Sequence, residues 1–257
     1  MEINNKISAL VITWNEENNI KQLIENLNFA DEIIIVDSFS TDKTKDIINE
    51  YKDIIFIENK FQDFTKQRNF AISYAKYPWI LFIDADERIT ASLREEILNT
   101  LKNNNSASAY FFFRKFMFKD SPLNFSGWQT DKNIKLFKKD KAIYIIDRLV
   151  HEKLIVEGRK EKLKNKLIHF SYTDYESYKS KMIMYGKLKA KELHIKNLKV
   201  TFFHLYLKPL YKFSYSYLIR LGILDGVNGI IICYLNALSV YVTFKELKKL
   251  NNQLSPK

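Results

Sequence analysis

The residues best suited to chemistry follow an apolar run at 80–83, where Asp84 and Asp86 stand one residue apart and Glu87 comes next. Carboxylates so close together repel each other, and after a buried strand they also lose hydration, unless a cation compensates them. With oxygen ligands and no thiol nearby, the expected cation is Mg²⁺ or Mn²⁺. Such an ion keeps several waters and completes its shell with substrate phosphates, so the pattern indicates a diphosphate site.

Glycine usage excludes the common phosphate-binding loops from the first half of the chain. The 257 residues contain six glycines, and the first is Gly127. A P-loop and a dinucleotide fingerprint both need glycines between a strand and the helix after it. A nucleotide bound in this half must therefore be held by other means.

The elements that would position these carboxylates alternate between apolar strands and amphipathic helices. The pattern predicts strands at 6–14, 32–38, 54–59 and 79–87, and helices at 17–27, 41–51, 64–76 and 90–102. Thr41 or Asp42 would begin the second helix, and Thr90 the fourth. Four repeats of this kind predict a parallel sheet with helices on both faces.

Ligands of such sheets bind at the carboxyl ends of the strands. Three polar clusters end strands here: residues 13–17 with Thr13, Asn15 and Glu16, then Asp37 with Ser38, then 84–87. Each cluster alone could be a turn or the first turn of a helix. Because all three end equivalent strands, we expect them to converge.

Beyond residue 105 the pattern changes. Antiparallel strands are expected at 108–118 and 133–146, the latter a hairpin turning near residues 139–140, and the segments 148–154 and 167–174 follow them. From 175 the pattern is helical, divided by Pro209 and by the glycines at 222, 226 and 229. We therefore predict a domain over 1–174, with halves 1–103 and 104–174, and a basic helical extension over 175–257.

Charge is distributed unevenly along the chain. Residues 1–100 contain 11 Lys and Arg against 18 Asp and Glu, whereas residues 101–257 contain 30 against 12. A basic rear half suits nucleic acid, anionic lipid or a phosphorylated substrate. The apolar run at 230–244 is short for a membrane span, so it is either a core helix or an element lying on a membrane surface.

Cellular location follows from two simple features. A single cysteine, Cys233, excludes a disulfide framework, and the N-terminus lacks the pattern of a signal peptide. The expected location is cytoplasmic, with peripheral contact on the cytoplasmic face of the inner membrane.

Four segments of the first half carry a family resemblance. VITWNEENNI, IIIVDSFSTDKT, KQRNFAI and WILFIDADE resemble the nucleotide-sugar-binding half of a family 2 glycosyltransferase of the GT-A type. RLVHEKL, LIHFSY and LIRLGILDGVNG resemble the bacterial branch that includes lipopolysaccharide core β-1,4-glucosyltransferases. The resemblance implies an α/β fold with a mixed, mainly parallel sheet flanked by helices, and a helical C-terminal extension.

The resemblance also implies roles for individual residues. Thr13, Asn15 and Glu16 would flank the nucleoside, Asp37 would read the uracil edge, and Arg68 would approach the base or diphosphate. Asp84 would hold the ribose or donor and take part in catalysis, and Asp86, with Asp84, would ligate the metal. Here Asp37 is followed by Ser38 and Phe39, where the family commonly has a second Asp or a Gly.

Inverting transfer needs a general base near the acceptor hydroxyl and a metal beside the departing diphosphate. Relatives place an acidic residue well after the two aspartates, and the counterpart here is Glu152. Asp147 is the second candidate, and Glu152 could instead pair with Arg148. His151 could bind the metal or the acceptor, His169 could be a core or acceptor-site residue, and Trp128 could stack on a sugar or pack in a core.

The predicted protein is thus a metal-dependent inverting glycosyltransferase that moves a hexose, glucose by subfamily resemblance, from a UDP-sugar to a cell-envelope saccharide such as lipopolysaccharide core. Its acceptor would be a saccharide or a lipid-linked saccharide, and nucleic acid is not an expected partner. Two alternatives stay open. One is transfer to a polyprenyl phosphate, and the other is a non-catalytic, basic membrane-surface protein on the same scaffold.

Overall fold

The structure of the protein is a computed structural model. It describes all residues except 1–4, 104–105, 120, 149–150, 173 and 254–257, together with the side chains of 146–148, 151–152 and 171–172. Contacts divide the chain into two compact units. The first unit contains residues 1–114 and 132–169, and the second contains 115–131 and 170–257. The functional division predicted at residue 174 stays a prediction.

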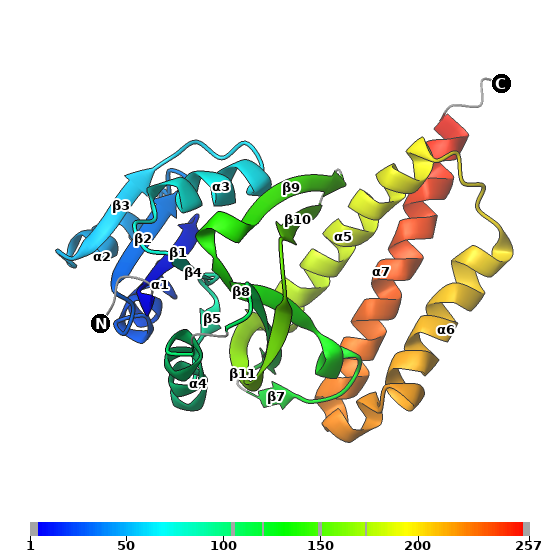
Figure 1. The fold of residues 1–257 in the computed structure, drawn as a ribbon. Coiled ribbons are helices and arrows are strands. Elements are labelled where there is room, and N and C mark those ends of the chain that lie inside the picture. The colour runs from blue at the N-terminus through cyan, green and yellow to red at the C-terminus, as the bar shows by residue number, and fades with distance from the viewer. Residues whose placement is uncertain (1–4, 104–105, 120, 149–150, 173, 254–257) are drawn as a thin grey trace. The chain divides into compact units, whose positions relative to one another are not determined.

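The first four strands form the predicted parallel arrangement (Figure 1). The elements of this part are β1 (Ile7–Thr13), α1 (Ile20–Asn26), β2 (Glu32–Asp37), α2 (Thr44–Asn49), β3 (Ile54–Glu58), α3 (Phe64–Tyr74), β4 (Trp79–Phe82), β5 (Glu87–Arg88) and α4 (Ala91–Leu101). β1 lies between β2 and β4, so the ends of these strands meet at one edge, as predicted.

Antiparallel strands extend this sheet into a mixed one. They are β6 (Ala109–Phe118), β7 (Ser121–Leu123), β8 (Lys132–Lys138) and β11 (Lys160–Tyr172). The strand order is β3-β2-β1-β4-β8-β6-β11-β5, with β7 beside β6. β4 pairs antiparallel with β8, which brings a strand from the middle of the chain next to the two aspartates. The predicted mixed sheet with flanking helices is confirmed.

Apolar side chains cover both faces of the sheet. On one face, residues of β1 such as Ala9 and Val11 pack with α1 and α4 through Leu23 and Leu93. On the other face, alternate residues of the same strands, such as Leu10, pack with α3 and with a second, smaller sheet. The alternation follows from the two-residue period of a strand and buries the parallel strands on both sides.

The hairpin predicted over 133–146 is wrong. The chain turns at Lys139–Lys141, but β9 (Ala142–Arg148) pairs with β10 (His151–Val156) in a separate two-stranded sheet, not with β8. Asn69 of α3 explains the difference, because its amide donates to the Tyr144 carbonyl (2.8 Å) and accepts from the Tyr144 N–H (3.1 Å). These two bonds hold β9 against α3.

Replacing Asn69 with alanine should therefore lower the free energy of unfolding by about 1–3 kcal/mol, because two partly buried backbone groups of Tyr144 lose their partner. Urea unfolding of N69A measures the effect. Asn49→Ala is the control, since Asn49 is an exposed residue in the last turn of α2. Equal midpoints for the two variants would contradict this role for Asn69.

Helix starts agree in part with the sequence prediction. Thr90 begins α4, and its side chain accepts a hydrogen bond from the Leu93 N–H. α2 begins at Thr44, three residues later than Thr41. Asp42 nevertheless acts at this helix start, because its carboxylate accepts from the N–H of Thr44 at 3.0 Å. The acidic side chain near the first turn also compensates the positive end of the helix.

The second unit is built mainly from helices. They are α5 (Tyr175–Ile195), α6 (Lys208–Ser214) and α7 (Gly226–Gln253), with π-helical turns Phe203–Leu207 and Tyr215–Ile219 on either side of α6. α5 and α7 pack side by side (Figure 1). Gly186 permits their close approach, because a Cβ there would lie 2.8 Å from the Ser239 carbonyl oxygen. Pro209 lies in the first turn of α6 and does not interrupt the helical run.

Among the described residues, one helical stretch, Gly222–Gln253, is long and apolar enough to cross a membrane, and 39% of its most apolar window is buried. The helical segment before it exposes large apolar side chains. They include Phe202, Leu207, Leu210, Tyr211, Leu218 and Ile219. Scattered apolar residues are normal on a surface, whereas these are concentrated in one segment of the chain.

Candidate active site

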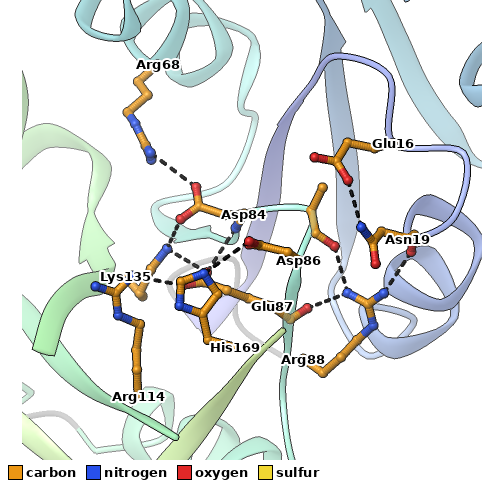
Figure 2. A network of polar contacts seen from close by, with 11 residues as sticks. Glu16, Asn19, Arg68, Asp84, Asp86, Glu87, Arg88, Arg114, Lys135 and His169 are labelled. Atoms are coloured by element: carbon orange, nitrogen blue, oxygen red, sulfur yellow. Dashed lines mark hydrogen bonds and ion pairs between the residues drawn. The ribbon is translucent and has the colours of Figure 1, made fainter. Parts of the chain in front are cut away.

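The carboxylates at 84–87 form a tight turn between β4 and β5 (Figure 2). The Asp84 N–H donates to the Glu87 carboxylate (3.0 Å), and the Glu87 N–H donates to the Asp84 carbonyl (3.0 Å). Lys135 of β8 lies between the two side chains and donates to Asp84 Oδ2 and Glu87 Oε2, each at 2.6 Å. Arg68 of α3 completes the group with a 3.1 Å ion pair to Asp84 Oδ1.

The charges in this turn are buried or partly buried and compensate one another. Burial alone would raise the pKa of Asp84, but Lys135 and Arg68 hold it well below its usual range. Burial would lower the pKa of the Lys135 ammonium, and the two carboxylates raise it instead. Glu87 is fully buried and its pKa stays raised, because burial outweighs the attraction of Lys135. Asp84 and Lys135 are thus fixed in their charged forms.

Asp86 lies beside this group and contacts His169 of β11. The Asp86 carboxylate and His169 Nε2 are 3.1 Å apart, and both side chains are partly exposed. Burial favours a higher pKa for Asp86, but the contact with His169 lowers it, so the carboxylate is ionised. The register of β11 against β5 places His169 opposite Glu87 and explains how a residue 83 positions away reaches Asp86.

The Asp86–His169 pair fits a divalent metal. A carboxylate and an imidazole are ligands for Mn²⁺, and a hard cation needs few protein ligands when phosphates and water complete its shell. Within the described residues, no cluster of three or more His, Cys, Asp or Glu side chains could hold a metal by itself. The arrangement therefore suits an ion that arrives with its substrate.

Arg88 links the 84–87 turn to the loop after β1 through hydrogen bonds. Its Nη1 donates to the carbonyls of Ala85 and Glu87 at 2.7 Å, and its Nη2 donates to the Asn19 carbonyl at 2.9 Å. Asn19 in turn donates to the Glu16 carboxylate at 2.8 Å. The pKa of Glu16 is raised by burial and by the negative charges of Asp86 and Asp42, so Glu16 belongs to the same acidic edge.

The ends of β1 and β2 are joined by a network centred on Asp37. Its fully buried carboxylate accepts from the Thr13 hydroxyl (2.9 Å) and from the Ser40 N–H (2.7 Å) and hydroxyl (2.5 Å). Asn15, at a φ of 55°, accepts from the Thr41 N–H at 2.8 Å. Asp37 thus organises the loops, and its predicted contact with a base stays a prediction.

Two aromatic rings project from these loops. Trp14 is 65% exposed and Phe39 is 53% exposed with a φ of 59°. Large rings exposed on loops held this firmly are suited to stacking on a flat ligand. The sequence argument assigned neither ring a role, although both stand next to polar residues that it singled out.

For several other predicted site residues, the structure describes the strand but not the side chain. Arg148 lies on β9 and His151 and Glu152 on β10, in the small sheet, but their side chains lie outside the described residues, as does that of the alternative base, Asp147. Trp128 belongs to the second unit, where its ring packs against Phe116 with centroids 4.1 Å apart.

Several residues of the site were missed or undervalued by sequence reasoning. Lys135, Arg88 and Arg114 were given no role, and His169 was given no metal role. Arg114 Nη1 lies 3.8 Å from the buried Glu87 carboxylate. A signal for Lys135 does exist, because it stands between the apolar residues Ile134 and Leu136 within a strand, and a buried lysine needs a carboxylate partner.

Comparison with known proteins agrees with this geometry. The model of the family described as glycosyl transferase family 2 matches residues 8–145, more than half of the chain. This chain belongs to glycosyl transferase family 2. It is a glycosyltransferase, and the predicted family resemblance is confirmed.

Individual glycosyltransferases match over nearly the whole chain. The lipopolysaccharide core biosynthesis glycosyltransferase LpsC of Rhizobium meliloti is 28% identical over 91% of this chain and 92% of its own. An uncharacterized glycosyltransferase of Rickettsia bellii is 29% identical over 98% and 89%. Among solved structures, S. aureus TarS 1-349 in complex with UDP covers 98% of this chain and 93% of its own, with a TM-score of 0.50 and 14% identity, which shows a shared fold.

Proposed function

We propose that this glycosyltransferase transfers a hexose from a UDP-sugar to a saccharide of the cell envelope, of the lipopolysaccharide core type, with the help of Mg²⁺ or Mn²⁺. The observation that carries the proposal is the Asp86–His169 pair beside the ion-paired Asp84, at the strand edge of a family 2 glycosyltransferase. The similarity to LpsC supports the acceptor class, and the UDP complex of TarS, which shares the fold, supports the nucleotide.

The donor would lie across the ends of β1, β2 and β4. Trp14 or Phe39 would stack on the uracil, while Thr13, Asn15, Glu16 and Asp37 would shape the loops around the nucleoside. Arg68 would approach the base or the diphosphate from α3. Asp84 accepts one hydrogen bond on each oxygen from protein side chains. An ionised carboxylate has about four acceptor positions, so it can still accept from a hydroxyl of the ribose or sugar.

Asp86 and His169 would hold the metal, with Asp84 close by. The bound ion would compensate the negative charge that develops on the departing diphosphate. Lys135 keeps Asp84 in place without a proton on it. Asp84 therefore stays ionised at neutral pH, as does Asp86 beside it, and Asp86 would be free to receive a cation and its phosphates.

Glu152 is our proposed base for the acceptor hydroxyl, because it follows the two aspartates in the order that the family resemblance implies. We propose His151 and Arg148 as acceptor contacts. We also propose that the exposed apolar and basic helical surface over 199–224 contacts the cytoplasmic face of the inner membrane, where a lipid-linked acceptor would be presented. That stretch contains Lys199, Lys208, Lys212 and Arg220 and no Asp or Glu.

Calorimetry with UDP tests the donor site. We expect UDP to bind the wild type in the presence of Mn²⁺ and much more weakly without it. His169→Ala should weaken the Mn²⁺-dependent binding at least about 10-fold, because the ion loses one of its two protein ligands. His194→Ala is the control, since His194 contacts Asn251 in the second unit.

Each result is informative. Equal UDP binding with and without Mn²⁺ would remove the metal from the proposal, and no binding of UDP in either condition would remove UDP as the donor nucleotide. An H169A effect no larger than that of H194A would remove His169 as a ligand. A screen of UDP-sugars for Mn²⁺-dependent UDP release would then identify the sugar.

A further inference from the structure

The second unit contains a polar cavity of about 240 Å³, equal to roughly eight water molecules by volume. Its walls come from the loop before β8, from α6 and the π-helical turn after it, and from α7. The lining side chains that can donate hydrogen bonds are those of Trp128, Lys212, Tyr215, Ser216, Arg220 and Asn236. Among the described residues that line the cavity, Lys212 and Arg220 carry charge and none is Asp or Glu, so the lining is cationic.

The two cations of this cavity are not neutralised by carboxylates. In the described part of the chain, neither Lys212 nor Arg220 forms an ion pair with an Asp or Glu. Arg220 Nη2 donates only to the neutral Thr130 hydroxyl, at 3.1 Å. Two positive charges facing one small space repel each other, and an anion between them would relieve that repulsion.

A buried donor in the same wall also lacks an acceptor. The Trp128 indole Nε1 is buried and has no hydrogen-bond partner among the described residues. An orphaned buried donor is rare in native structures and calls for a ligand or a water. Because Trp128 also lines the cavity, an anion bound there could accept this hydrogen bond.

The loop that forms one wall is held in an unusual conformation. Ser126 and Gly127 both have positive φ, 62° and 101°, a region that non-glycine residues seldom adopt. Asp225 holds the loop by accepting from the N–H groups of Asn124 and Phe125, each at 3.0 Å, and from the Ser126 hydroxyl at 3.1 Å. With three donors its carboxylate is well compensated, and strained backbone maintained in this way is typical of binding sites.

The same loop also fixes the backbone at Arg220. The Arg220 carbonyl accepts from the Ser126 N–H at 3.0 Å and from Gln129 Nε2 at 3.2 Å. A rigidly placed cation loses less conformational freedom when it binds a ligand, so the cavity is organised in advance. A guanidinium and an ammonium together suit the oxygens of a phosphate group.

We propose that this cavity binds a phosphate group, either from a lipid headgroup or from a soluble phosphorylated compound. Apolar side chains beside Arg220 are strongly exposed, Leu218 at 57% and Ile219 at 68%, which is the surrounding that a headgroup would meet. The site lies wholly within the second unit and is independent of the donor site.

Calorimetry with inorganic phosphate, compared with chloride at matched ionic strength, tests the proposal. We expect phosphate to bind the wild type, and the double variant Lys212→Gln with Arg220→Gln to bind it at least 10-fold more weakly. Lys199→Gln with Lys208→Gln removes the same charge from the same helical stretch without touching the cavity, and should stay within about twofold of wild type.

Two further variants separate binding from folding. Lys212→Gln alone changes an exposed side chain and should weaken phosphate binding several-fold without lowering the melting temperature. Trp128→Phe keeps the aromatic packing against Phe116 and removes only the N–H donor, and it should also weaken binding several-fold. UDP binding in the presence of Mn²⁺, measured in parallel, should be the same in all these variants.

Vesicles distinguish the two sources of phosphate. If a lipid headgroup enters the cavity, sedimentation with phosphatidylglycerol vesicles should fall at least 10-fold more in K212Q/R220Q than in K199Q/K208Q, with phosphatidylcholine vesicles as the neutral reference. If both double variants lose vesicle binding equally while only K212Q/R220Q loses inorganic phosphate, the ligand is soluble. Equal loss of inorganic phosphate by both, or no preference of the wild type for phosphate over chloride, would overturn the proposal.

Discussion

Replacing Lys135 with methionine should lower the free energy of unfolding by about 3–5 kcal/mol, because it leaves Asp84 and the fully buried Glu87 without their shared counter-ion. Methionine fills most of the space of the lysine stem, so the loss would come from charge and not from a cavity. Urea unfolding measures it. Lys138→Met is the control on the same strand, since Lys138 lies over the Trp79 ring and contacts no carboxylate in the described part of the chain.

The loss of unfolding free energy in the Lys135→Met variant should become smaller as pH falls. In the variant, burial of Glu87 without Lys135 raises its folded pKa further above the unfolded value, which is about 4. A group with a raised folded pKa contributes stability that is present below the unfolded pKa and lost as pH rises. The deficit should therefore shrink between about pH 7 and about pH 5. A deficit equal at both values would contradict the assignment to unpaired carboxylates.

In the wild type the opposite sign applies to Asp84. Its folded pKa is depressed by Lys135 and Arg68, so its contribution is present above the unfolded pKa of about 4 and is lost only as pH falls below that value. Wild-type stability from this residue should therefore not change between about pH 7 and about pH 5. A change in stability between pH 7 and pH 5 that is seen in the variant but not in the wild type would therefore come from the unpaired carboxylates and not from a general effect of acid on the protein.

Replacing Asp86 with asparagine should reduce the rate of sugar transfer by about 10²–10³-fold while leaving the fold intact. Asparagine keeps the size of the side chain and its contact with His169, but it removes the negative charge that would hold the divalent ion. The assay is Mn²⁺-dependent release of UDP from the donor that the wild type uses. Thermal unfolding in parallel should show a shift of no more than a few degrees.

Asp140→Asn is the matched control, because Asp140 is an exposed residue in the turn between β8 and β9. Its activity should equal that of the wild type. If D86N keeps a third or more of wild-type activity, Asp86 is not the residue that holds the metal. If it loses activity together with most of its stability, the loss reports folding and the role of Asp86 in catalysis is not supported.

Local sequence pattern was enough to predict most strands and helices in the first half of the chain. The strands that became β1 to β4 and the helices between them follow from short-range periodicity, and Thr90 as the start of α4 follows from capping chemistry. The convergence of residues 13–17, 37–38 and 84–87 needed only the rule that parallel strands end at one edge. These inferences depend on neighbours in sequence or on strand direction.

The parts that could not be predicted depend on contacts distant in sequence. Lys135 lies 48 positions after Glu87, and His169 lies 83 positions after Asp86, so no local pattern joins them. The hairpin error has the same origin. The turn at residues 139–141 is real, but Asn69 decides that β9 packs on α3, and an asparagine on a helix gives no sign of such a partner.

The strand order also determines when the acidic edge becomes complete during synthesis. β4 needs β8 as its neighbour, and β5 needs β11. When only the first hundred residues have left the ribosome, the 84–87 turn has neither Lys135 to neutralise it nor His169 to orient Asp86. The site at 84–87 is therefore complete only once β8 and β11 have been made, because a fragment ending near residue 103 would contain neither Lys135 nor His169.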